Sequence, residues 1–179
     1  MKNWKTIKIG ETKNYDEALK KAGINVSSYA QELLDKMPSN KKESIDLVKM
    51  SVKELGFDER ATIEEIFNRI KELGGELCSA EVGVALRLDY LDQPLGEWLL
   101  IAMQPIFDSV GFPFVFCLVR YEGGLWLYDG WALPDNEWNP DDKFVFRIRE
   151  SLEPFGTLTP LGEAILTCKN AGYEVIKRM

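Results

Sequence analysis

Histidine is absent from this sequence of 179 residues. Its absence excludes the Ser-His-Asp and Cys-His nucleophile systems, the histidine-based zinc sites and the usual general base at neutral pH. Any catalysis by this chain has to use carboxylates, cysteine, lysine, tyrosine or backbone groups. One gap in the composition therefore removes several classes of enzyme at once.

Cysteine is scarce, and its three copies, Cys78, Cys117 and Cys168, lie far apart in the sequence. An odd number of scattered cysteines, with Cys117 inside an apolar run, predicts reduced thiols in a reducing compartment. No CxxC pair is present, so a zinc site built from cysteine alone is not expected. We predict neither a bound metal nor a cofactor.

Long apolar stretches are also missing. No segment approaches the roughly 18 uninterrupted apolar residues of a membrane-spanning helix. No basic leader precedes a short apolar segment. These two absences predict a cytoplasmic protein that does not enter a membrane.

Charge is unevenly distributed along the chain. The net charge is −7, but residues 1–53 carry +4 and residues 54–158 carry −12. An acidic body repels the phosphate backbone of nucleic acids, so nucleic acid could bind only through the basic N-terminal third. The simpler interpretation of the charge is a solvated surface that keeps the protein soluble.

Three apolar runs separated by glycine-containing turns, residues 98–106, 113–121 and 125–131, dominate the centre of the sequence. The first two are apolar at both alternating positions, a pattern typical of strands that are covered on both faces. A thinner run at residues 144–148 alternates with arginine, which predicts a half-exposed strand at a sheet edge. Together these runs predict an α+β fold built on an antiparallel β-meander of three to five strands and covered by helices.

The N-terminal third predicts a helical hairpin. Residues 15–22 form one expected helix, and residues 27–37 form a second that stops before a proline. The polar segment 39–43 is the expected joint in the chain. It would separate a small basic N-terminal segment, residues 1–43, from an acidic α+β main domain, residues 44–179.

Further helices are expected on either side of the apolar runs. Thr62 opens a capping box, and the apolar residues after it recur at helical spacing until a glycine pair. Another helix begins after Ser79 and is expected to give way to an extended piece near Leu86. At the C-terminal end, a helix that starts at Pro160 and a short strand at residues 173–176 are predicted.

A cluster of ionisable side chains follows Ser79. Glu81 and Asp89 are candidate acid and base groups if burial separates their pKa values, with Arg87 binding an anionic group of the substrate. The simpler interpretation is that Arg87 and a nearby acid form a structural ion pair, while Cys78 packs as a small buried hydrophobe. No motif fixes the geometry that a nucleophile would need.

Tryptophan is concentrated in the second half of the chain, at Trp98, Trp126, Trp131 and Trp138. Aromatic faces beside acidic and amide side chains can stack a sugar or a base, or hold a proline or a cationic side chain of a partner. The predicted binding residues are Tyr128, Asp129, Trp131, Asp135 and Trp138. The simpler interpretation places the first two tryptophans in the core and uses Trp131 and Trp138 to anchor a loop. The acidic residues of this loop lack the spacing of an EF-hand, so no metal site is predicted.

The stretches ELCSAEVG at residues 76–83 and GEWLLIAM at residues 96–103, with LRL between them, resemble a group of small uncharacterised bacterial proteins. The resemblance covers about residues 48–149. Members of the group tend to have proline at the position of Ser79 and leucine at that of Gly75, so the start of this segment differs here. The resemblance implies a bacterial or phage-related origin and transfers no catalytic role.

The favoured hypothesis is a non-catalytic bacterial or phage-associated interaction module. It would present the aromatic and acidic loop around Trp131 to a protein partner, with the basic helical hairpin as an accessory contact. One alternative is a carboxylate-dependent hydrolase that acts on a sugar or a nucleotide through Glu81, Arg87 and Asp89. Another is a DNA-binding regulator that uses residues 14–37 as a helix-turn-helix.

Overall fold

The computed structural model describes residues 1–38 and 42–148, all within one compact unit, Met1–Arg149. The described helices are α1 (Tyr15–Lys21), α2 (Ser28–Lys36), α3 (Ile63–Glu72) and α4 (Ala80–Asp89). The described strands are β1 (Lys5–Ile9), β2 (Asn25–Val26), β3 (Glu43–Ser51), β4 (Ala61–Thr62), β5 (Gly75–Glu76), β6 (Trp98–Ile101), β7 (Ile106–Phe107), β8 (Pro113–Tyr121), β9 (Gly124–Trp131), β10 (Glu137–Trp138) and β11 (Lys143–Ile148).

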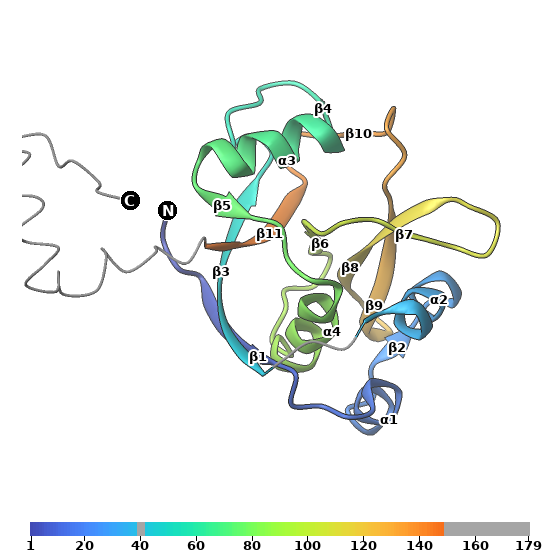
Figure 1. Cartoon of the computed structure of the whole chain (residues 1–179). Coiled ribbons are helices and arrows are strands. Elements are labelled where there is room, and N and C mark those ends of the chain that lie inside the picture. The colour runs from blue at the N-terminus through green and yellow to red at the C-terminus, as the bar shows by residue number, and fades with distance from the viewer. Residues whose placement is uncertain (39–41, 149–179) are drawn as a thin grey trace, which may run out of the picture. The chain divides into compact units, whose positions relative to one another are not determined.

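Most of these strands belong to one large, curled, mixed sheet (Figure 1). The sheet has nine strands in the order β1-β3-β11-β6-β8-β9-β2, with β5 beside β11 and β7 beside β8. The pairs β11–β6 and β2–β9 are parallel. The predicted antiparallel meander of three to five strands with an N-terminal helical hairpin is therefore wrong. The antiparallel neighbours β6, β8 and β9 form only one part of a larger sheet.

The strand β11 shows one physical reason for this error. The sequence predicts it at a sheet edge, but it lies inside the sheet, antiparallel to β3 and parallel to β6. Phe144 and Phe146 are completely buried, and the Arg147 guanidinium donates to the Glu43 carboxylate of β3 at 2.7 Å. Alternation with arginine reports which face of a strand meets water. It does not report whether the strand has neighbours on both sides.

The N-terminal elements extend this sheet. The two expected helices are present as α1 and α2, but β2 lies between them and pairs with β9, while β1 pairs with β3. The helix α2 buries Ala30, Leu33 and Leu34. The N-terminal third therefore does not form a hairpin that stands alone. Part of the expected joint, residues 39–41, lies outside the described residues, so the domain boundary at residue 43 stays a prediction.

The helix α3 confirms the predicted capping box. The Thr62 hydroxyl accepts a hydrogen bond from the Glu65 amide at 3.4 Å, and the Glu65 carboxylate accepts one from the Thr62 amide at 2.8 Å. The apolar face of the helix is buried through Ile66 and Ile70. Gly74 then ends the helix with a φ of +84°, a conformation that favours glycine.

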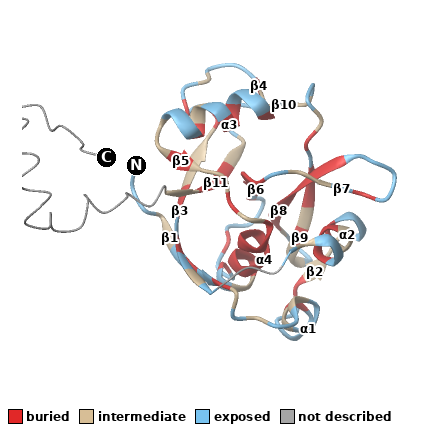
Figure 2. Cartoon of the chain, in the orientation of Figure 1, coloured by how far each residue is buried: buried red, intermediate tan, exposed pale blue. Residues whose placement is uncertain are grey.

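The helix α4 is buried on almost every side, and Figure 2 shows it in red near the centre of the unit. It runs without interruption to Asp89, so the predicted change to an extended piece near Leu86 is wrong. A helix that is covered all round carries no polar stripe, and the sequence therefore lacks the usual helical period here. The first polar residue in the alternation from Leu86 to Asp89, Arg87, is itself completely buried, so the alternation does not mark an exposed strand face.

Gly83 lets α4 approach β8 closely, which yields a testable prediction. A Cβ atom at position 83 would lie 2.8 Å from Cβ of Phe116, a side chain that is fully buried and cannot withdraw. Alanine should gain about 1 kcal/mol in helix propensity. Overpacking costs about 1–3 kcal/mol. We expect Gly83→Ala to lower the free energy of unfolding by about 1 kcal/mol in urea denaturation.

The matched control for this prediction is Gly123→Ala. Apart from its two chain neighbours, no residue has an atom within 4 Å of a Cβ at position 123. We expect this variant to stay within about 0.5 kcal/mol of the wild type. A stabilised Gly83→Ala protein would show that the contact with Phe116 relaxes at little cost.

Two of the cysteines lie in the described part of the chain. Cys78 and Cys117 are buried free thiols, and burial raises the pKa of each to about 12. Both are therefore protonated and unreactive at neutral pH. Cys168, the expected final helix from Pro160 and the expected strand at residues 173–176 all lie outside the described residues.

None of the helices in residues 1–38 and 42–148 has the length and apolar composition required to cross a lipid bilayer.

Candidate functional site

A cavity of about 600 Å³ lies between β9, the start of α2 and the segment that carries β10. Its lining combines aromatic, acidic and amide side chains. The lining residues are Ser27, Ser28, Tyr29, Trp98, Tyr128, Asp129, Gly130, Trp131, Asn136, Glu137, Trp138, Asn139 and Asp142. We call this space the β9 cavity.

One wall of the β9 cavity is an aromatic cluster around Phe114. Tyr29 of α2 stacks on Phe114 with a centroid distance of 4.9 Å, and Trp131 meets the same ring edge-on at 5.5 Å. Phe114 is buried, whereas Tyr29 and Trp131 are 43% and 48% exposed. Phe114 thus holds the two exposed rings in place. Because the rings are already ordered, binding a partner costs less side-chain conformational entropy.

Three further rings, those of Trp98, Tyr128 and Trp138, also line the cavity, and Trp98 is 42% exposed. Trp98 and Tyr128 meet edge-to-face at 5.7 Å, and Trp138 packs perpendicular to the buried Phe144 at 5.7 Å. The indole Nε1 of Trp138 is buried and has no hydrogen-bond partner within the part of the chain that the structure describes. Trp138 therefore supports the core as well as the cavity.

The charged side chains that line the β9 cavity are all acidic. Asp129, Glu137 and Asp142 line it, and the lining residues include no lysine or arginine. The Asp129 carboxylate accepts a hydrogen bond from the Ser27 hydroxyl at 2.6 Å, and Asp142 accepts one from the Asn139 amide at 2.7 Å. Such a site favours ligands that carry positive charge.

The structure brings together most of the binding residues that the sequence predicts. Tyr128, Asp129, Trp131 and Trp138 all line the β9 cavity. Asp135 does not line it and is exposed. The simpler interpretation holds in part: Trp126 packs against the core, but Trp98, which was expected there, is 42% exposed. Of the two expected loop anchors, Trp138 packs on the buried Phe144, whereas Trp131 remains 48% exposed.

The sequence did not indicate that α2 contributes to this site. Ser27, Ser28 and Tyr29 reach the cavity because β2 pairs with β9 in parallel, about 100 positions further along the chain. A parallel pair leaves no turn signal and can join any two segments. The one local signal was Ser27, which caps α2 by accepting from the Ala30 amide at 3.1 Å.

The candidate catalytic residue Glu81 lies in a different place. Its buried carboxylate accepts hydrogen bonds from the Tyr15 hydroxyl at 2.5 Å and from the Gly10 amide at 2.8 Å. Burial and this hydrogen bond to the carboxylate raise the pKa of the Tyr15 hydroxyl. Glu81 lines a separate cavity of about 610 Å³, and neither Arg87 nor Asp89 belongs to that lining.

Arg87 and Asp89 have partners of their own. The Arg87 guanidinium is completely buried and donates to the Gln93 side-chain oxygen at 2.5 Å and to the Tyr90 carbonyl. Asp89 forms an ion pair with Lys5 near the surface. In the described residues no carboxylate pairs with Arg87, so the predicted structural ion pair is not formed there.

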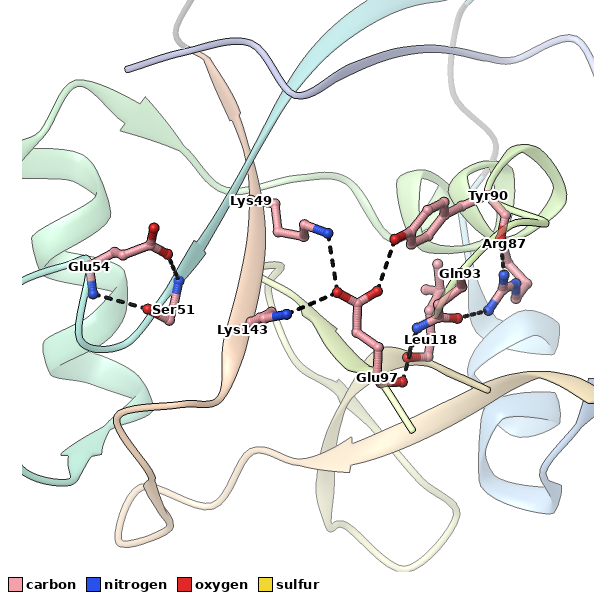
Figure 3. Close-up of polar contacts among 9 residues, drawn as sticks. All are labelled: Lys49, Ser51, Glu54, Arg87, Tyr90, Gln93, Glu97, Leu118 and Lys143. Atoms are coloured by element: carbon pink, nitrogen blue, oxygen red, sulfur yellow. Dashed lines mark hydrogen bonds and ion pairs between the residues drawn. The ribbon is translucent and has the colours of Figure 1, made fainter. Parts of the chain in front are cut away.

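A buried polar network around Glu97 was not found by sequence reasoning (Figure 3). One carboxylate oxygen of Glu97 accepts from Lys49 and from Lys143, each at 3.1 Å, and the other accepts from the Tyr90 hydroxyl at 3.0 Å. Burial alone would raise the pKa of Glu97, but the hydrogen bonds from Lys143, Lys49 and Tyr90 outweigh it and hold that pKa below its usual range. Both carboxylate oxygens are thus engaged within the protein.

The backbone of Glu97 continues this network through Gln93. The Gln93 amide donates to the carbonyls of Glu97 and Leu118, each at 3.0 Å, and its oxygen accepts from Arg87 (Figure 3). The network therefore ties the end of α4 to β6, β8, β3 and β11. Apart from the buried Nε of Arg87, which has no hydrogen-bond partner among the described residues, its side-chain groups pair with one another, as expected for a structural element of the core.

No match is found to a protein-family model, to a curated protein or to a solved structure. Within the described ranges, no group of three or more histidine, cysteine, aspartate or glutamate side chains is placed to hold a metal ion.

Proposed function

We propose that this chain is a non-catalytic protein-interaction module and that the β9 cavity is its docking site. The observation that supports this proposal is the pair of half-exposed rings, Tyr29 and Trp131, fixed over the buried Phe114 at the mouth of an acidic cavity. Aromatic side chains held rigidly at a surface contribute most of the binding energy in many protein interfaces. The bacterial or phage-related origin that the resemblance implies is part of the same proposal.

Binding is favoured over hydrolysis by the positions of the candidate catalytic groups. A carboxylate-dependent hydrolase needs its acid and base on the same reacting bond. Glu81 contacts Gly10 and Tyr15, whereas Asp89 contacts Lys5 near the surface. These two carboxylates have separate surroundings, and the arrangement offers no joint site for them.

The DNA-binding alternative receives little support from the surroundings of α2. A recognition helix contacts bases through its first residues. Here Ser27 at the start of α2 donates to the buried Asp129, and the acidic β9 cavity lies beside it. Negative charge at this position opposes the approach of a phosphate backbone.

Trp131→Ala provides the test of the proposed docking site. We expect partner binding to weaken at least about tenfold, because the exposed ring is the best-placed anchor at the cavity mouth. The measurement is capture of host proteins from a bacterial lysate on immobilised wild-type and variant protein, with the captured protein identified and its affinity measured. Thermal stability should change little, since Trp131 is 48% exposed.

Leu95→Ala is the matched control, because Leu95 is an exposed apolar residue that does not line the cavity. It should leave capture unchanged. Equal capture by the wild type and by Trp131→Ala would remove the proposal. Trp138 is a poorer choice for this test, since its loss would also disturb the packing on Phe144.

A further inference from the structure

The backbone of β9 presents hydrogen-bonding groups toward the β9 cavity. In an antiparallel pair, alternate residues direct both their N–H and their C=O to the partner strand. The Ala132 amide donates to the Pro113 carbonyl of β8 at 2.9 Å, which sets this alternation. Gly130 and Tyr128 therefore face β8 through their backbones, while Asp129 and Trp131 direct theirs to the other side of β9.

On the edge of β9 that faces away from β8, only the first residues pair with another strand. The strand β2 pairs with Trp126 and Leu127, and the Ser27 amide donates to the Leu127 carbonyl at 3.1 Å. The chain then enters α2, where the Ser27 carbonyl accepts from the Gln31 amide. The ladder on this side of β9 ends at that point.

Three backbone groups of β9 remain without a partner in the described residues. They are the N–H and C=O of Asp129 and the N–H of Trp131, while the Trp131 carbonyl accepts from the Asn136 amide group at 3.3 Å. Unpaired groups along a strand edge form a template for a further strand. Asp129 and Trp131, the two residues that carry these groups, both line the β9 cavity.

Side chains on both faces of the open edge suit a bound strand. Trp131 and Asp129 lie on the face that carries Tyr29, as the contacts of Phe114 show. Trp138 lies on the opposite face, where a Cβ atom at Gly130 would approach its ring to 3.5 Å. A strand added to this edge would place alternate side chains against aromatic rings on either face.

We propose that the β9 cavity binds an extended peptide segment of a protein partner, which adds as a strand to the edge at Asp129 and Trp131 and places a lysine or arginine beside Asp129. This inference rests on the proposed docking function and specifies its mode. The positive side chain follows from the lining, which holds three carboxylates and no basic residue. Main-chain hydrogen bonds give such complexes their affinity, and the alternate side chains give them their selectivity.

The experiment uses synthetic peptides and the full chain. The probes are the capped peptide Thr-Val-Lys-Val-Thr and its counterpart with glutamate at the centre. We expect the lysine peptide to bind at least about tenfold more tightly. On binding, hydrogen exchange of the Asp129 and Trp131 amides should slow, while the Tyr128 and Gly130 amides, already paired with β8, should not change.

Two sets of modified probes test the hydrogen bonds directly. N-methylation of alternate amides in the lysine peptide should abolish binding in one register and leave it nearly intact in the other, because only every second residue faces β9. The Asp129→Asn variant retains an acceptor for the Ser27 hydroxyl and should reduce the preference for lysine over glutamate.

The inference would be overturned if the lysine peptide did not bind, or if both N-methylated series bound equally well. It would also be overturned if a neutral oligosaccharide, and not the peptides, slowed hydrogen exchange of the Asp129 and Trp131 amides. The same experiments distinguish a failure of this inference from a failure of the proposed docking function. If Trp131→Ala abolishes partner capture while N-methylation has no effect, the docking site stands and strand addition is wrong. If Trp131→Ala leaves capture intact, both proposals fail.

Discussion

Replacing Arg87 with alanine is expected to lower the free energy of unfolding by about 4 kcal/mol. The side chain is completely buried, so its truncation opens a cavity in the core. Large-to-alanine changes at such positions cost about 2–5 kcal/mol. The truncation also leaves the Gln93 oxygen and the Tyr90 carbonyl without their donor, at about 1–3 kcal/mol for each buried group.

One effect opposes this loss. Burial lowers the pKa of the Arg87 guanidinium to about 10, so the group stays charged at neutral pH and its desolvation already weakens the native state. Removing the charge gives back a few kcal/mol in comparable buried sites. The cavity and the two unpaired acceptors together exceed that gain, and the net effect is therefore destabilising.

Arg87→Lys serves as the control in urea denaturation. Lysine keeps the charge and most of the volume, but its ammonium group cannot reproduce the planar fork that reaches Gln93 and Tyr90 together. We expect it to cost about 2 kcal/mol, between the wild type and alanine. An Arg87→Ala protein within 1 kcal/mol of the wild type would contradict the structural role of this side chain.

The local features of the fold could be predicted from the sequence, and the long-range ones could not. The capping box at Thr62 and the hairpin between β8 and β9 are fixed by residues close in sequence. The interior position of β11 depends on β3 and β6, which lie far away along the chain. No periodicity or turn residue reports such pairings.

The candidate sites also contain local features that the sequence indicates and long-range features that it does not. Three of the predicted binding residues lie on β9 and the fourth, Trp138, lies on β10, seven positions after Trp131; the concentration of tryptophan in this part of the sequence was a sufficient signal for them. Tyr29 reaches the same cavity through the parallel pair of β2 with β9, which the sequence does not indicate. Arg87 was expected to meet a carboxylate, but its acceptors are the Gln93 amide oxygen and the carbonyls of Tyr90 and Trp126. An arginine that pairs with neutral acceptors leaves no complementary charge in the sequence by which its partners could be predicted.

Glu97→Gln is expected to lower the free energy of unfolding by about 2–3 kcal/mol at neutral pH. Glutamine keeps the shape of the side chain but leaves Lys49 and Lys143 without a counter-charge. Breaking a fully buried pair costs about 3–5 kcal/mol. The expected loss is smaller because the Lys143 side chain is 42% exposed and water partly screens its charge.

The same variant carries a pH signature with a definite sign. Because the pKa of Glu97 is lower in the folded protein than in the unfolded chain, its carboxylate stabilises the fold above about pH 4.3. That stabilisation is lost as the pH falls through the lowered value. The difference in unfolding free energy between the wild type and Glu97→Gln should therefore be constant at neutral pH and shrink below about pH 4.

Glu72→Gln separates this effect from general acid destabilisation. Glu72 pairs with Arg69 on the surface with its side chain 65% exposed, and such pairs contribute at most about 1 kcal/mol. Its loss should produce little change at any pH. Glu65, whose pKa is lowered by hydrogen bonds from Thr62 and not by Lys49 or Lys143, titrates equally in the wild type and in the variant, so it cancels in the difference. A difference for Glu97→Gln that stayed constant down to pH 3 would mean that the carboxylate does not depend on Lys49, Lys143 and Tyr90 for its charge.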